Sequence, residues 1–139
     1  MKPPNEQNSP WVMDTNAETF DQDVFERSKV TPVVVDFWST FCRPCHVLAP
    51  ILQDLAEEYQ GQFVLVKANT DELPQCATQF PIRGVPTVFA IVDGKITDSF
   101  EGIPSSDELH SWIDRVLLSQ ALSEAESVEA SEPDRAEAT

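Results

Sequence analysis

The sequence has few basic residues, few cysteines and no long apolar run. Its 139 residues include nine lysines and arginines against 24 aspartates and glutamates, a formal net charge of −15 at pH 7. Because nucleic acids and anionic membranes are bound by clustered Lys and Arg, we expect neither as a partner. No run approaches the roughly 20 apolar residues of a transmembrane helix, and no basic start followed by an apolar stretch marks a signal peptide. We therefore expect a cytoplasmic protein.

Both ends of the chain lack the apolar residues that a folded core needs. Residues 1–10 hold three prolines and no apolar run, and residues 119–139 carry six acids and one arginine without an aromatic residue. Such segments bury too little apolar area to offset the entropy lost on ordering. We predict an N-terminal tail at 1–10, one domain at 11–118, and an acidic, disordered C-terminal tail at 119–139.

Between the tails, the apolar periodicity predicts an alternating α/β fold. The expected strands are 11–14, 32–38, 62–70, 85–92 and 95–102, and the expected helices are 17–28, 42–61, 71–80 and 105–118. The pair Asp93-Gly94, between the last two strands, is typical of a hairpin turn. Alternating strands and helices followed by a hairpin predict a mixed β-sheet with helices on both faces.

The stretch Cys-Arg-Pro-Cys-His at residues 42–46 is compatible with three kinds of site. It fits a redox dithiol, half of a zinc site or a haem-attachment motif. Haem attachment belongs to exported chains, and a structural zinc site needs four ligands. The further candidates for zinc, Cys76 and His110, lack ligand spacing. We expect the dithiol, with no metal and no bound cofactor.

Cys42 is predicted to lie at the N-terminus of a helix that follows a buried strand. Unpaired N–H groups and the partial positive charge there stabilise a thiolate. One helical turn brings the Cys45 sulfur within disulfide reach of the Cys42 sulfur. We expect Cys42 to be the attacking thiolate, Cys45 to be the shielded resolving thiol, and His46 to be a solvated residue beside them.

Four stretches of the chain, in this order, resemble the thioredoxin family: VVVDFWSTFCRPCHVLAPIL, VKANTD, IRGVPT and DGK followed by EG. The resemblance runs from about residue 11 to residue 118. It implies a thioredoxin fold and the reduction of protein disulfides through a Cys42–Cys45 cycle. It also implies that a thioredoxin reductase drawing on NADPH reduces the pair again. The chain itself has no phosphate-binding glycine loop.

The resemblance also assigns roles to residues around the two cysteines. Asp36 matches the family's buried aspartate below the resolving cysteine, and Lys67 matches the lysine near it. Because apolar residues flank Asp36, we expect burial to raise its pKa and expect it to accept the proton of Cys45. The residues expected to contact the substrate are Phe41, Arg43, Pro44, Val85, Pro86 and Gly102, of which Pro86 matches the family's cis-proline.

Two departures from the family pattern lie beside Cys42. Phe41 stands where the family usually has tryptophan, and Arg43 stands where thioredoxin usually has glycine. The fixed positive charge of Arg43 favours a thiolate at Cys42 and hence the reduced form, so the family alone does not set the direction of electron flow. Cys76 is expected to be a partly buried bystander.

The chain is also similar to the thioredoxin domain of bacterial co-chaperones in which TPR repeats follow. In that class the domain docks to a chaperone or holds clients, and its redox chemistry is secondary. The 21 residues after Leu118 are too few for one TPR unit of about 34 residues. Both cysteines of the pair are present, which favours the redox enzyme over this alternative.

Overall fold

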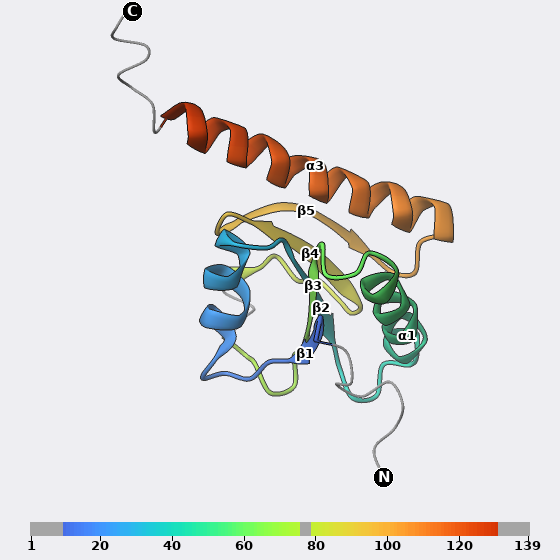
Figure 1. Ribbon diagram of the computed structural model, residues 1–139. Helices are drawn as coiled ribbons and strands as arrows, with labels where there is room; N and C mark the ends of the chain where they lie inside the picture. Colours follow the sequence, from blue (N-terminus) through green and yellow to red (C-terminus); the bar gives the residue numbers. More distant parts are fainter. Residues whose placement is uncertain (1–9, 76–78, 131–139) are drawn as a thin grey trace, which may run out of the picture.

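A five-stranded mixed sheet forms the centre of the fold, in the order β1-β3-β2-β4-β5 (Figure 1). The computed structural model describes residues 10–75 and 79–130. The strands are β1 (Val12–Asp14), β2 (Val33–Trp38), β3 (Val64–Asn69), β4 (Thr87–Val92) and β5 (Lys95–Glu101). β1, β3 and β2 run parallel, whereas β4 and β5 are antiparallel to their neighbours. The predicted mixed sheet with a final hairpin is confirmed.

The turn between β4 and β5 shows why the hairpin forms at that position. Asp93 has φ 53° and Gly94 has φ 79°, both in the left-handed region. A two-residue hairpin turn with two positive φ angles matches the twist of its strands, and Asp-Gly is one of the sequences that adopt it. The local sequence therefore fixes the register of the last two strands next to the turn, as far as the irregularity between Ala90 and Ile91.

Helices cover both faces of the sheet, as predicted. α1 (Arg43–Glu58) and α3 (Ser106–Ala130) pack on one face. A π-helical turn, η1 (Gln22–Glu26), packs on the other and leads into a 3₁₀ turn, η2 (Arg27–Lys29). Figure 1 shows η1 and α1 on opposite sides of the strands. Side chains alternate along β2, so Val34 packs with α1 and α3 whereas Val33 and Val35 pack with η1.

α3 extends beyond the domain end expected at 118. In place of the structureless tail expected from 119, residues 119–130 continue the helix. Ala and Glu, which favour helix, make up half of this segment. Tertiary contacts also hold it, because Gln120 Nε2 donates to the Val30 carbonyl (3.1 Å) and Ser123 Oγ donates to Asp93 Oδ2 (3.1 Å).

Three expected segments lie partly or wholly outside the described residues. The N-terminal tail at 1–10 is described only at residue 10, and residues 131–139 of the C-terminal tail are not described. Within the helix expected at 71–80, Asp71, Glu72, Pro74 and Gln75 lie in turns, and Cys76 belongs to the undescribed residues 76–78. Across the part of the chain that is described, no helix has both the length and the apolar character to cross a membrane.

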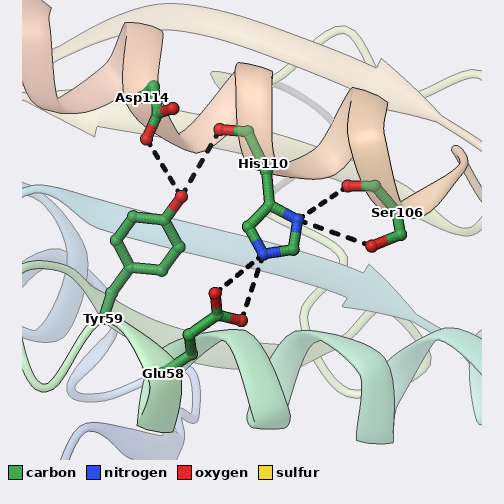
Figure 2. A network of polar contacts seen from close by, with 5 residues as sticks. All are labelled: Glu58, Tyr59, Ser106, His110 and Asp114. Carbon is green, nitrogen blue, oxygen red and sulfur yellow. Dashed lines mark hydrogen bonds and ion pairs between the residues drawn. The ribbon is translucent and has the colours of Figure 1, made fainter.

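A polar network joins α1 to α3 (Figure 2). His110 Nε2 lies 2.9 and 3.1 Å from the two carboxylate oxygens of Glu58, and its Nδ1 lies 2.8 Å from the Ser106 carbonyl oxygen. The Tyr59 hydroxyl donates to Asp114 Oδ1 at 2.9 Å. Because both ring nitrogens face acceptors, the Ser106 carbonyl first and Glu58 second raise the pKa of His110. Burial and then Asp114 raise the pKa of Tyr59 to about 12.

Candidate active site

A disulfide joins Cys42 to Cys45 at the N-terminus of α1, with their Cα atoms 5.3 Å apart. Cys42 is the N-cap of the helix, and its Sγ accepts a hydrogen bond from the Cys45 backbone N–H at 3.2 Å. The Cys42 sulfur therefore occupies the position where a helix stabilises negative charge. Cys45 is 1% exposed, whereas Cys42 is partly exposed. Of the two sulfurs, Cys42 is the one open to a substrate.

An exposed rim surrounds Cys42. Phe41 is 97% exposed, and Arg43 and Pro44 are exposed at the first two positions of α1. Pro44 fits this position because a backbone N–H there needs no partner within the helix. An exposed aromatic residue and an exposed arginine therefore directly precede and follow Cys42 in the chain.

Val85, Pro86 and Gly102 lie on the segments before β4 and after β5. The Val85–Pro86 peptide bond is cis, as the family resemblance implies. The Gly102 N–H donates to the Pro86 carbonyl oxygen at 3.2 Å, so the two segments are tied together. Gly102 has φ 78°, a conformation that glycine adopts without a steric penalty. Contact of these residues with a substrate stays a prediction.

Three side chains hold the loop that precedes Cys42. The Thr40 backbone N–H donates to Asp71 Oδ2 (3.1 Å), and Asn69 Nδ2 donates to Thr40 Oγ1 (3.3 Å). His46 Nε2 lies 2.8 Å from the Thr40 carbonyl oxygen, which makes Nε2 the donor. His46 is thus exposed beside the disulfide, as expected, and its hydrogen bond also holds the loop that precedes Cys42.

Asp36 lies in β2, with Lys67 beside it on β3 and Asp14 next on β1. Its side chain is fully buried, and neither carboxylate oxygen has a hydrogen-bond partner among the described residues. Burial raises the pKa of Asp36 to about 7, although the charge of Lys67 opposes this. A carboxyl group with this pKa can accept or give a proton near neutral pH.

A cavity of about 270 Å³ lies between α1 and the sheet, and Asp36, Lys67 and Cys45 all line it. Gln53 and Trp38 line the same cavity and were not foreseen from the sequence. Two patterns could have indicated them. Trp38 follows Asp36 by two residues, which places both on one face of β2. Gln53 follows Cys45 by eight residues, which places both on one i, i+4 row of α1.

The zinc alternative has little structural support. Within residues 10–75 and 79–130, no group of three His, Cys, Asp or Glu side chains could hold a metal ion. His110, one of its candidate ligands, is bonded to Glu58 and Ser106 in the α1–α3 network. Cys76, the other, lies outside the described residues.

Comparisons with known proteins agree with this geometry. The family model named Thioredoxin matches residues 11–115. Thioredoxin 1 of Synechococcus elongatus is 40% identical over 99 residues, which cover 71% of this chain and 91% of that protein. Thioredoxin of Acidithiobacillus ferridurans is 37% identical over 106 residues, 76% of this chain and 96% of that protein. The chloroplastic thioredoxin M-type of Spinacia oleracea is 39% identical over 106 residues, 76% of this chain and 58% of that protein.

Proposed function

Because the chain belongs to the thioredoxin family, we propose that Cys42 is the attacking thiolate and Cys45 the resolving thiol of its reaction. The protein is a thiol-disulfide oxidoreductase, and its substrates are protein disulfides. The observation that supports the assignment of roles is the difference in exposure. Cys45 is 1% exposed, whereas Cys42 is partly exposed and lies at the N-cap of α1.

In the first step, the Cys42 thiolate of the reduced protein attacks one sulfur of a substrate disulfide. The substrate S–S bond breaks, a Cys42–substrate disulfide forms, and the second substrate sulfur leaves as a thiolate that takes a proton from solvent. The backbone N–H of Cys45 points at the Cys42 sulfur, which stabilises its negative charge before the attack.

In the second step, Cys45 resolves this mixed disulfide. Asp36 takes the Cys45 thiol proton, and the resulting thiolate attacks the Cys42 sulfur. The Cys42–substrate bond breaks, the Cys42–Cys45 disulfide forms, and the second substrate thiolate leaves. Two electrons have then passed from the cysteine pair to the substrate. The pKa of about 7 supports Asp36 as the base, and the charge of Lys67 keeps that value from rising further.

The substrate contacts are assigned to two groups of residues, one next to Cys42 in the chain and one on the segments before β4 and after β5. The proposed contact residues are Phe41, Arg43, Pro44, Val85, Pro86 and Gly102. Exposure supports the first group, since Phe41 is 97% exposed beside Cys42. An exposed aromatic ring next to a reactive sulfur offers apolar contact area to an unfolded or flexible client segment. The hydrogen bond from Gly102 to Pro86 supports treating the second group as one unit.

The reductase that acts on the protein, its cellular location and the bounds of its catalytic domain are also proposals. We assign the regeneration of the dithiol to a thioredoxin reductase that draws on NADPH, and the place of action to the cytoplasm. The catalytic domain is assigned to residues 11–118. The acidic surface of the chain, with a net charge of −15, argues for protein rather than nucleic-acid partners.

A coupled assay tests this function. The protein is mixed with insulin, NADPH and a bacterial thioredoxin reductase, and both NADPH consumption and insulin precipitation are followed. We expect turnover that Cys42→Ser abolishes. Insulin reduction faster than with dithiothreitol alone, but no turnover with the reductase, would overturn the partner and keep the chemistry. No acceleration above the reductant alone in either case would overturn the function itself.

A further inference from the structure

Three buried polar groups line the cavity between α1 and the sheet. They are the carboxyl group of Asp36, the amide nitrogen Nε2 of Gln53 and the indole nitrogen Nε1 of Trp38. Among the described residues none of these atoms has a hydrogen-bond partner. Two of the groups are donors, and the ionised carboxylate is an acceptor. The groups are therefore complementary as donors and acceptor, but they are not hydrogen-bonded to one another.

Water is the ligand that fits this set. Buried polar groups are almost always hydrogen-bonded, either to protein or to ordered water. A cavity of about 270 Å³ has room for several water molecules, and it offers the polar partners that a buried water needs. Gln53 is 7% exposed although a glutamine on a helix is usually solvated, so its polar end is committed to this cavity.

We propose that Gln53 is a positioning residue for the redox reaction: its amide binds water in the cavity, and this water donates to Asp36 and links the carboxyl group to solvent. The proposal rests on the proposed function, in which Asp36 is the base for Cys45. The proton that Asp36 takes from the Cys45 thiol then passes to this water and out of the protein. The carboxylate is restored, and no further reactant is needed.

The groups around Asp36 explain why a neutral hydrogen-bond donor at residue 53 can change the pKa of Asp36. Lys67 faces Asp36 from β3, and Cys45 and His46 line the same cavity from α1. On the β4 side the register partner is the apolar Val88. Hydrogen bonds to the ionised form of a carboxyl group lower its pKa, whereas burial raises it. Water held by Gln53 therefore offsets part of the effect of burial without adding a charge.

Substitution of Gln53 by methionine tests the proposal, because methionine has a similar length and removes both the donor and the acceptor. The probe is the pH titration of the Asp36 carboxyl carbon, followed by NMR in the oxidised protein. We expect its pKa to rise by about one unit in Gln53→Met, on the scale of one lost hydrogen bond to a charged group. Gln53→Asn, which keeps an amide, should give an intermediate value. Gln62→Met makes the same substitution at an exposed residue and should leave the titration unchanged.

The outcomes separate this proposal from the function on which it rests. An unchanged Asp36 titration in Gln53→Met would overturn it, and so would a rise that Gln53→Asn does not reduce, since packing alone would then be the cause. The rate of mixed-disulfide resolution is measured against pH in parallel. If the midpoint of this rate profile shifts together with the pKa of Asp36, the result supports the role of Gln53 in the reaction. If the carboxyl titration shifts while the rate profile does not, Gln53 tunes Asp36 but Asp36 is not the base.

Discussion

Lys67 on β3 is paired in register with Asp36 on β2, yet its ammonium group forms an ion pair with Asp14 on β1, at 3.8 Å. The Lys67 side chain is 15% exposed, whereas Asp36 is fully buried. The charge of the lysine is therefore better solvated than the carboxyl group of Asp36. Burial then outweighs the attraction of Lys67 and raises the pKa of Asp36 to about 7. The site therefore holds a carboxyl group whose pKa of about 7 lies near neutral pH.

Asp36→Asn should change how stability depends on pH. The folded-state pKa of about 7 lies above the ordinary value of 3.8, so the native protein holds a proton that the unfolded chain has lost between these values. The contribution of Asp36 to stability should be most favourable below pH 3.8 and should fall by about 1.4 kcal/mol per pH unit up to about pH 7. Urea unfolding of the oxidised parent and of Asp36→Asn across this range should show this fall in the difference between their unfolding free energies.

The same variant should slow resolution of the mixed disulfide, by up to ~10²-fold above neutral pH, since Cys45 loses its proton acceptor. Asp54→Asn is the matched control, because Asp54 is an exposed aspartate on α1. It should leave both the pH dependence and the rate close to those of the parent. If Asp54→Asn behaved like Asp36→Asn, the effects would come from the loss of one negative charge anywhere on the protein and not from the position of Asp36.

Arg43→Gln should make the Cys42–Cys45 disulfide slightly harder to reduce. A guanidinium at the first residue of α1 favours the Cys42 thiolate and hence the reduced form. Arg43 is exposed, so a gain of ~0.5–1 kcal/mol is expected, as for other exposed ion pairs. At about 1.4 kcal/mol per 30 mV, the potential should fall by roughly 10–20 mV in equilibrium with glutathione.

High salt should remove most of this difference, because screening weakens exposed charge pairs. Arg27 is an exposed arginine on η2 and provides the control. Arg27→Gln should leave the reduction potential unchanged. An unchanged or higher potential in Arg43→Gln would mean that Arg43 does not tune the sulfur.

His110→Gln should remove a pH-dependent contribution to stability at the α1–α3 interface (Figure 2). The raised pKa of His110 means that its contribution is full below the ordinary value of 6.5 and is lost as pH rises through the folded-state value. The Ser106 carbonyl and Glu58 accept from the imidazole, and together with the charge of Asp114 they stabilise its charged form. Parent and variant should therefore differ more in unfolding free energy at pH 6 than at pH 9.

Tyr59→Phe provides the contrast at the same interface. It removes the hydrogen bond to Asp114, but Tyr59 itself stays protonated in this range because its pKa is raised to about 12. Its effect on stability should therefore be nearly the same at pH 6 and pH 9. Equal pH dependence in His110→Gln and the parent would contradict the role of the imidazolium.

The sequence predicts the fold well wherever local chemistry decides it. β-branched runs mark β2 and β3, Asp93-Gly94 marks the hairpin, and the motif at 42–46 places Cys42 at a helix N-terminus. The expected helix at 17–28 is less regular, since π-helical and 3₁₀ turns replace much of it. Phe20 and Phe25 of this segment pack with Phe37 and Phe80 on the η1 face of the sheet, and such tertiary packing can override helical periodicity.

The sequence does not predict contacts that depend on tertiary packing. The pairing of Lys67 with Asp14 requires β1 to lie beside β3, which no local pattern specifies. The spacing of Gln53 from Cys45 places both on one row of α1, but it does not indicate that this polar side chain is 7% exposed. The continuation of α3 past 118 depends partly on Gln120 reaching the Val30 carbonyl across 90 positions of sequence. Each of these follows from the assembled sheet and helices.

Cys45→Ser tests the division of work between the two cysteines most directly. The variant is reduced, mixed with a protein substrate that contains one accessible disulfide, and analysed by intact and peptide mass spectrometry, with Cys76→Ser as the matched control. The serine cannot resolve the first intermediate, so a stable one-to-one adduct should accumulate with the substrate bonded to Cys42. Cys76→Ser should form none and should turn over like the parent. Full turnover by Cys45→Ser, or an adduct mapped to Cys76, would contradict the account.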